Sequence, residues 1–374
     1  MLTRIGLLLP RSTEYPSMGF DILDGLRCRL KLYDDSGYQF FTESIGFGED
    51  NALNYAKAEK LVLQDNADII IAYCHSANAE SLYHLADALN KPFLILDAGM
   101  QLPQVAASRN CYHITLQGLH ACRIAGNMAG AGNRKVLMAT SFYDGGYRGP
   151  WSYDRGLSEA GGSVCGNYVS GFKPAEFTID RYLGLLRETD AGSVAACFSS
   201  YLAELFFKAL HEKNSEATPL PFYCSPFMAE EQLLHKCDFP GGEFYTVVPW
   251  TSSIDNAEQE KFVHSIYSEK DKAANIFHLL GWEAGIITEA IRQKGVQSLK
   301  DFAYGSPRGI TTFHPVTHYT YAPLYKGRIT ADKNGKCVLH IIETIPADAD
   351  MHVKVMSDQP SSIVSGWKNN YLCT

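Results

Sequence analysis

The sequence contains serine and histidine side chains that could do nucleophilic or metal chemistry, but none stands in a motif that such chemistry requires. His75 and Ser76 are adjacent after an apolar run, yet acyl transfer also needs an orienting acid and an oxyanion site, and the sequence indicates neither. His314 and His318 have the i, i+4 spacing of a metal pair, but Pro315 argues against the helix that would align them. Phosphate-binding glycine motifs, nucleophile elbows and zinc-protease motifs do not occur. We therefore expect no catalytic residues, no metal and no cofactor.

Polar residues follow several apolar runs, where they could bind a small molecule without reacting with it. Residues 76–78 follow the run 69–74 and begin an expected helix, whose free backbone N–H groups could hold an anion or a carbonyl group. The simpler interpretation is that Ser76 only caps this helix, and both can be true. Residues 97–101 follow the next run, where Asp97 could accept hydrogen bonds from a ligand or cap a turn. Two segments at equivalent positions in the second half of the chain are 199–201 and 225–227.

Aromatic side chains are concentrated near the same positions. About half of them are expected in the core, whereas those in loops beside glycine or proline are better candidates for a binding wall. Such a wall contributes apolar area and, for a cationic ligand, a cation–π interaction of roughly 0.5–2 kcal/mol. The loop aromatics are Tyr15, Tyr147, Trp151 and Trp250.

The strands and helices that position these residues alternate along the chain. The run 67–73 is apolar except at Asp68, which is typical of a strand buried on both faces of a parallel sheet. Further strands are expected at 5–9, 39–45, 92–96 and 111–115, and helices at 19–32, 51–66 and 77–89.

The alternation of strands and helices starts again near residue 134. Four strand landmarks recur at offsets of 123 to 133 residues: 134–138 after 4–8, 197–199 after 74–76, 221–224 after 92–95, and 245–248 after 112–115. Their common order predicts two similar α/β units, each a doubly wound parallel sheet with right-handed crossovers. Ligands bind beyond the carboxyl ends of the strands in such sheets, so a cleft between the two lobes is the expected site.

The segment after residue 250 is too short for a third domain. Helices are expected at 257–268 and 273–294, followed by strand-forming residues at 317–329 and 337–343. We expect the helices to pack onto the first lobe and the last strands onto the second, which makes a hinge with several crossovers. The predicted lobes are 1–118 plus 252–318, and 119–251 plus 319–374.

Composition excludes several other classes of protein. The chain has 374 residues, of which 46% are hydrophobic, and its 33 basic and 41 acidic residues give a net charge of −8, which disfavours nucleic-acid binding. No apolar run approaches the roughly 18–20 residues that cross a bilayer. The ten cysteines form no CxxC pair and indicate a reducing compartment. With no signal-like run near Met1, we expect a cytoplasmic protein or a secretion signal outside this numbering.

Three stretches resemble the type I periplasmic binding proteins, in particular the leucine/isoleucine/valine-binding and amide-receptor branch. They are Ile5-Gly-Leu-Leu-Leu-Pro10 with Gly19, Ala58-Glu-Lys-Leu-Val62 leading to Asp68-Ile-Ile-Ile71 and Ser76, and Lys91-Pro-Phe-Leu-Ile-Leu96. The resemblance implies two lobes joined by three crossovers that close on a small ligand. Carried over by position, Ser76, Ala77 and residues 98–101 would hold its polar end, and the other lobe would contribute Tyr147 and Tyr201. The residues expected at the ligand are Tyr15, Ser76, Ala77, Asp97, Ala98, Gly99, Met100, Gln101, Tyr147, Ser199, Tyr201, Phe227 and Trp250.

Two departures from the family pattern bear on the ligand. Amino-acid-binding members place an acid after the second-lobe strand, whereas here Glu230 and Glu231 come several residues later. Asp97 stands where a serine or threonine is common, and it would repel a ligand carboxylate by about 1 kcal/mol or more. An amide, aromatic or cationic ligand is therefore as plausible as an amino acid. Three functions stay open: the receptor of an ABC uptake system, a cytoplasmic ligand sensor that signals to a regulatory protein, and, least favoured, an enzyme on this fold.

Overall fold

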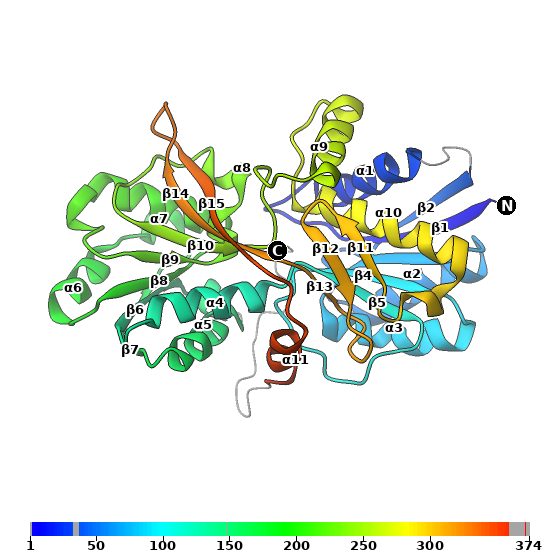
Figure 1. Cartoon of the computed structure of the whole chain (residues 1–374), viewed down its shortest axis with the longest axis horizontal. Helices are drawn as coiled ribbons and strands as arrows, with labels where there is room; N and C mark the ends of the chain where they lie inside the picture. The colour runs from blue at the N-terminus through cyan, green and yellow to red at the C-terminus, as the bar shows by residue number, and fades with distance from the viewer. Residues whose placement is uncertain (1, 33–36, 147, 359–370, 372–374) are drawn as a thin grey trace.

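Two α/β lobes lie side by side and are joined in the middle of the molecule (Figure 1). The structure is a computed structural model that describes residues 2–32, 37–146, 148–358 and 371. Each lobe is built on its own mainly parallel sheet, as expected from the alternating strands and helices. Among the described residues, no helix is both long and apolar enough to cross a bilayer.

The first lobe contains a five-stranded parallel sheet in the order β2-β1-β3-β4-β5. All five residues of the central strand β3 are buried, and its alternate side chains enter the cores on the two opposite faces of the sheet. The strands are β1 (Thr3–Leu9), β2 (Tyr38–Ser44), β3 (Ile69–Tyr73), β4 (Phe93–Asp97) and β5 (Cys111–Thr115), and the helices are α1 (Met18–Lys31), α2 (Asn51–Leu63), α3 (Ser76–Leu89), α9 (Ala257–Lys270) and α10 (Ile276–Lys294).

The second lobe contains a seven-stranded sheet in the order β15-β14-β10-β9-β8-β6-β7, in which β14 pairs antiparallel with both β10 and β15. Its strands are β6 (Lys135–Ser141), β7 (Ser163–Ser170), β8 (Ser193–Cys197), β9 (Phe222–Cys224), β10 (Phe244–Val248), β14 (Leu324–Ala331) and β15 (Cys337–Ile345). Its helices are α4 (Gly118–Gly130), α5 (Arg148–Glu159), α6 (Asp180–Glu188), α7 (Ser200–Lys213) and α8 (Glu231–Leu234). Its short 3₁₀ helices are η2 (Asp144–Gly146), η3 (Pro174–Glu176), η4 (Asn214–Glu216) and η5 (Pro226–Ala229), whereas η6 (Val296–Leu299) follows α10 in the first lobe.

Close helix pairs fix the shape of both lobes. A Cβ on Gly25 of α1 would lie 2.1 Å from the carbonyl oxygen of His278 in α10, and one on Gly281 would lie 2.0 Å from that of Ile22. In the second lobe, a Cβ on Gly156 of α5 would lie 1.8 Å from the carbonyl oxygen of Arg123 in α4. Only glycine allows backbones to approach this closely, so these positions bring each helix pair into direct contact.

The chain crosses between the lobes three times, from β5 to α4, from β10 to α9 and from β13 to β14. A small antiparallel sheet of β11 (Ala303–Ser306), β12 (Gly309–Phe313) and β13 (Thr320–Tyr321) stands beside the first lobe. Arg308, which follows β11, forms a fully buried ion pair with Glu283 of α10 and donates to the carbonyl oxygen of Thr115 at the first crossover. This ion pair therefore ties the small sheet to the hinge.

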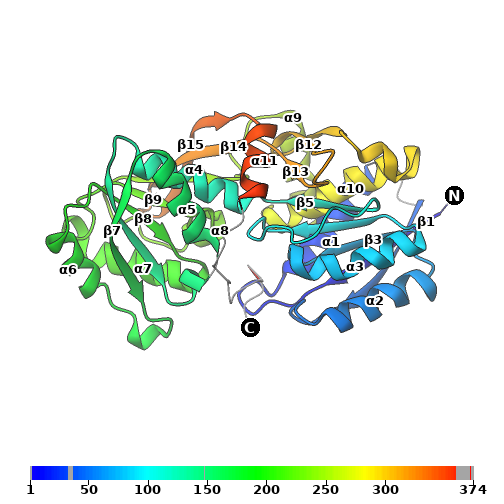
Figure 2. The ribbon, with the colours of Figure 1, turned by 90° about the horizontal axis from the view of Figure 1, so that it is seen from below.

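The expected change of lobe between residues 318 and 319 falls just before β13. Thr320 and Tyr321 pair with β12, and Tyr319 bridges to His113 of β5, so this stretch still lies with the first lobe's sheet. After β15, helix α11 (Ala349–Ser357) returns toward the crossovers beside α4 (Figure 2). Asp358 at its end accepts from Arg123 of α4 and Arg155 of α5.

Candidate functional site

A pocket lies between the lobes, beside the hinge, where loops at the carboxyl ends of strands from both sheets meet. The first lobe contributes Tyr15 from the loop after β1 and the start of α10. The second lobe contributes the segment after β9 and the crossover after β10. We call this the interlobe pocket; its lining is Tyr15, Pro226, Ala229, Glu230, Glu231, Gln232, Val248, Pro249, Trp250, Ala274, Asn275, Ile276, Phe277 and Tyr371.

Aromatic rings form the apolar wall of the interlobe pocket. Tyr15 and Phe277 meet edge to face with ring centroids 5.4 Å apart. The ring of Tyr371 makes edge-to-face contacts with both of them and with Phe227, at centroid distances of 5.1 to 5.4 Å. These are favourable geometries for aromatic pairs, so the wall is suited to a flat ring.

Glu230 is one of the two glutamates that line the interlobe pocket, and its carboxyl group lies against the aromatic wall. The Tyr15 hydroxyl donates to Oε2 of Glu230 over 3.1 Å, which links the two lobes, whereas the buried Oε1 has no hydrogen-bond partner within the described part of the chain. Burial raises the pKa of Glu230 to about 7, and hydrogen bonding from Tyr371 and Tyr15 lowers it by less. A carboxyl group with this pKa can donate a hydrogen bond as an acid or accept one as a carboxylate near neutral pH.

The segment that carries Glu230 is held by its neighbours. Strand β9 ends at Cys224, and the 3₁₀ turn η5 brings Glu230 back to the cleft before α8 begins. The next residue, Glu231, accepts from the hydroxyls of Thr251 and Ser252 over 2.5 and 2.8 Å. The segment after β9 is therefore fixed to the second crossover.

Trp250 closes the hinge side of the interlobe pocket. Its Nε1 donates to Oε1 of Gln259 over 2.8 Å, and its ring meets Phe262 of α9 edge to face at 5.9 Å. Trp250 thus connects the crossover after β10 to the helices of the first lobe.

A second polar group stands at the rim of the second sheet. The buried carboxylate of Asp144 accepts from the hydroxyls of Ser141 and Ser199 over 2.7 and 2.6 Å and from the backbone N–H of Ser199. Burial raises the pKa of Asp144 to about 6, against the effect of these hydrogen bonds. Ser200, the next residue along the chain, donates to Glu14 of the first lobe, which is a second hydrogen bond across the cleft.

Of the predicted ligand contacts, the structure brings three together. Tyr15 and Trp250 line the interlobe pocket, and Phe227 packs against Tyr371. Tyr147 lies outside the described residues, as does the side chain of Ser76, although Ser76 begins α3.

The other predicted contacts lie away from the interlobe pocket and have partners of their own. Asp97 is buried, and its carboxylate contacts Nδ1 of His113 at 3.2 Å and accepts from the N–H of Gly99 over 2.7 Å. The N–H of Ala77 donates to Nδ1 of His75, which caps α3. Ser199 is bonded to Asp144 as described above. These contacts are structural, and a binding role for these residues stays a prediction.

The remaining predicted residues lie along the same rims. Ala98, Met100 and Gln101 are buried, and Gly99 has φ +68°, which the turn after β4 requires. Met100 packs toward Gly118 and Gly149 of the second lobe, where its side chain would crowd an added Cβ. Tyr201 donates to the carbonyl oxygen of Phe172 over 2.6 Å.

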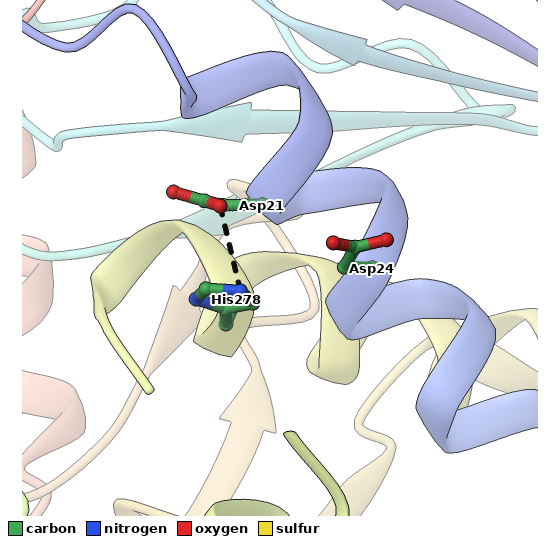
Figure 3. Close-up of side chains that lie close together, drawn as sticks. All are labelled: Asp21, Asp24 and His278. Atoms are coloured by element: carbon green, nitrogen blue, oxygen red, sulfur yellow. Dashed lines mark ion pairs between the residues drawn. The ribbon is translucent and has the colours of Figure 1, made fainter. Parts of the chain in front are cut away.

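One cluster in the described part of the chain has the side chains of a metal site. Asp21 and Asp24 of α1 face His278 of α10 (Figure 3), with Oδ1 of Asp21 3.5 Å from Nε2 of His278. Two ammonium groups already pair with these acids: Lys270 lies 2.7 Å from Asp24, and Lys272 lies 3.3 Å from Asp21. The cluster is best understood as an ion-pair network between α1 and α10. The sequence pair His314 and His318 makes loop and backbone contacts instead.

Sequence reasoning did not assign a ligand role to Glu230, Phe277 or Tyr371. In the sequence, Glu230 comes several residues after the second-lobe strand, and a one-dimensional pattern does not show that η5 folds it back to the cleft. Phe277 is one of many apolar residues in the helical pattern of α10, so nothing in the sequence distinguishes it. Tyr371 is far from the other pocket residues in the sequence. The sequence feature that could have indicated the site is the pair of glutamates that follows Pro226.

Comparison with known proteins agrees with this architecture. A family model described as periplasmic binding protein matches residues 3–336. An ABC transporter substrate-binding protein from Sphaerobacter thermophilus is 18% identical with a TM-score of 0.79, over 92% of this chain and 98% of that one. A solute-binding protein of an ABC transporter from R. palustris, solved with benzoate, is 21% identical with a TM-score of 0.72, over 94% and 98% of the two chains.

A further R. palustris solute-binding protein, solved with 4-hydroxybenzoate, is 16% identical with a TM-score of 0.73, again over 94% of this chain and 98% of that one. A search of curated proteins finds no match. The family match extends over most of the chain, and the solved structures share its two-lobed fold. The chain belongs to the periplasmic binding protein family.

Proposed function

We propose that this protein is a solute-binding protein whose lobes close over one small organic molecule in the interlobe pocket, as the receptor component of an ABC uptake system. The observation that carries the proposal is the pocket itself: both lobes and the hinge supply its lining, so a ligand there contacts every part that moves on closure. A ligand that binds the closed arrangement better shifts the population toward it. The proposal gives the pocket a binding role and no catalytic one.

The lining favours an aromatic ligand over an aliphatic amino acid. Tyr15, Phe277 and Trp250 offer ring faces and edges, and the carboxyl group of Glu230 accepts a hydrogen bond from Tyr15 beside them. A ligand carboxylate next to ionised Glu230 would be repelled, so neutral and cationic aromatic compounds fit best, and aromatic acids fit where Glu230 is protonated. Two structurally similar proteins were solved with benzoate and 4-hydroxybenzoate, which supports a ligand of this size.

A cytoplasmic sensor of the amide-receptor type is the second candidate. The nine cysteines in the described part of the chain are free thiols, and eight of them are buried. An unbridged thiol set of this size favours a reducing compartment, where a binding protein would signal closure to a regulatory protein. A neighbouring permease and ATPase pair in the genome would favour uptake, and a neighbouring regulator gene would favour sensing.

A thermal-shift screen tests the proposed function. The panel contains amino acids, amides, polyamines and neutral, cationic and acidic aromatic compounds. A compound that binds only the folded state stabilises it by about 2.7 kcal/mol at one hundred times its Kd, which raises Tm measurably.

Each compound found in the screen is then titrated against wild type, Glu230→Gln, Trp250→Ala and the exposed control Glu260→Gln. We expect Glu230→Gln to change the affinity and the control to leave it unchanged. A compound whose affinity is insensitive to substitution of both Glu230 and Trp250 would place the site elsewhere and contradict the proposal.

A further inference from the structure

The interlobe pocket contains a side chain of the protein itself. Tyr371, near the C-terminus, is 8% exposed, and its ring contacts Tyr15 and Phe277 of the first lobe and Phe227 of the second. Its carbonyl oxygen accepts from the hydroxyl of Ser12 over 2.5 Å. A single tyrosine thus bridges the two lobes at the place where a ligand would.

The hydroxyl group of Tyr371 also has a partner in the pocket. The carboxyl group of Glu230 interacts with the Tyr371 hydroxyl as well as with that of Tyr15. The pocket therefore faces both parts of the side chain: the rings of Tyr15, Phe227 and Phe277 meet the flat ring edge to face, and the carboxyl group of Glu230 interacts with the hydroxyl. A phenol is the smallest molecule with these two features.

The space left beside Tyr371 is too small for another ring. The remaining cavity is about 40 Å³. A cavity that admits benzene has a volume of roughly 150 Å³, whereas roughly 10–15 Å³ is enough for one water molecule. With Tyr371 in place, the pocket has room for water but not for an aromatic solute.

We propose that Tyr371 is the chain's own occupant of the interlobe pocket, that this pocket is a phenol-binding site, and that a phenolic ligand binds only after Tyr371 has left. This inference rests on the proposed function and adds the substrate class and a competing intramolecular ligand. Only twelve residues separate Asp358, at the end of α11, from Tyr371. Because Tyr371 belongs to the same chain as the pocket, it competes as an intramolecular ligand, so it excludes weak ligands and yields to tight ones.

The backbone at Tyr371 is consistent with a displaceable occupant. Its φ is +69°, in the left-handed region that non-glycine residues rarely adopt. Release of the tail relieves this unfavourable conformation, so the contacts of the ring and of Ser12 are what keep Tyr371 in the pocket.

The test uses p-cresol, which is the tyrosine side chain without its backbone. Its Kd is measured by calorimetry with the full chain as wild type, Tyr371→Ala and Tyr371→Phe. Tyr267→Ala is the matched control, because it removes a tyrosine ring that is 63% exposed on α9. We expect Tyr371→Ala to bind p-cresol at least tenfold more tightly than wild type, because an occupied site lowers the apparent affinity by the fraction that is free.

Two comparisons separate the ring from the hydroxyl. Tyr371→Phe keeps the ring but loses the hydroxyl, so its affinity for p-cresol should lie between those of wild type and Tyr371→Ala, and Tyr267→Ala should match wild type. Toluene, which lacks the hydroxyl, should bind Tyr371→Ala at least fivefold more weakly than p-cresol. Equal p-cresol affinity in Tyr371→Ala and wild type would overturn the inference, and equal affinity for toluene and p-cresol would overturn the phenol assignment.

A second measurement needs no substitution and covers the case in which Tyr371→Ala does not fold. Chymotrypsin cleaves after accessible tyrosines, so saturating p-cresol should speed cleavage after Tyr371 in the wild type, seen by mass spectrometry as loss of residues 372–374. Unchanged or slower cleavage would contradict displacement. A panel compound that binds with lobe closure, together with no effect of Tyr371→Ala, would remove this inference alone, whereas no binding by wild type or Tyr371→Ala to any compound would remove the proposed function.

Discussion

Substitution of Glu230 by glutamine should change how the stability of the protein depends on pH. Burial raises the pKa of Glu230 from 4.5 to about 7 in the folded state. Below pH 4.5 the group is protonated in both states. Between pH 4.5 and 7 the unfolded chain loses the proton while the native state keeps it, so this contribution to stability is lost as the pH rises, and above pH 7 no further loss occurs. The full change is about 3 kcal/mol, at 1.36 kcal/mol per pKa unit.

Urea denaturation of wild type and Glu230→Gln at intervals from pH 4 to 8.5 measures this contribution. Glutamine keeps the shape and stays neutral, so the free energy of unfolding of the variant minus that of the wild type should rise by about 3 kcal/mol from pH 4.5 to above pH 7. Subtraction at each pH removes the similar contribution of Asp144, whose pKa is also raised. Glu260→Gln on the surface should show no such rise. A difference that stays constant with pH would refute the assignment of Glu230 as a buried, mostly desolvated carboxyl group.

Three further substitutions test the hinge and the helix packing. Glu283→Gln leaves the Arg308 guanidinium buried without its counter-charge and should cost about 3–5 kcal/mol in urea denaturation; a loss below 1 kcal/mol would show that the pair is not buried in solution. Trp250→Ala should weaken ligand binding and also lower the free energy of unfolding by about 3–5 kcal/mol, because the ring packs on Phe262; unchanged stability with unchanged affinity would contradict both roles. Gly281→Ala would place a Cβ 2.0 Å from the α1 backbone and should lower Tm by an amount equivalent to about 1–3 kcal/mol, and an unchanged Tm would mean that α1 and α10 are less closely packed.

The fold could be predicted from the sequence because its signals are local. The strand over Ile69–Tyr73 is apolar at every position, and a parallel strand buried on both faces requires such a run. The repeat of strand landmarks after about 130 residues predicts the second sheet without any knowledge of contacts. The close approach at Gly25 and Gly281 could not be seen, since a glycine inside a helical pattern does not reveal what packs against it.

The site was only partly predictable, because its residues have partners that are distant in the sequence. Asp97 follows a buried strand at the rim, as a ligand contact would, but its carboxylate meets His113 on the neighbouring strand, and this depends on the order β4-β5. Glu230 reaches the pocket only because η5 turns the chain after β9. Sequence position relative to a strand end therefore predicts the rim, while the direction of each side chain depends on the turn that follows.

The contacts across the cleft connect these observations to function. Tyr15 donates to Glu230, and Ser200 donates to Glu14, so the lobes are bridged by the protein's own side chains while Tyr371 fills the pocket between them. A ligand that replaces Tyr371 must recover the same ring contacts, and the contacts it adds beyond these determine how far it shifts the population. If the tail occupies the pocket nine times out of ten, the apparent affinity of the ligand is about one tenth of its intrinsic affinity. Weak aromatic compounds would therefore fail to displace Tyr371, whereas a ligand that also bonds Oε1 of Glu230, which has no hydrogen-bond partner among the described residues, would bind tightly enough to replace it.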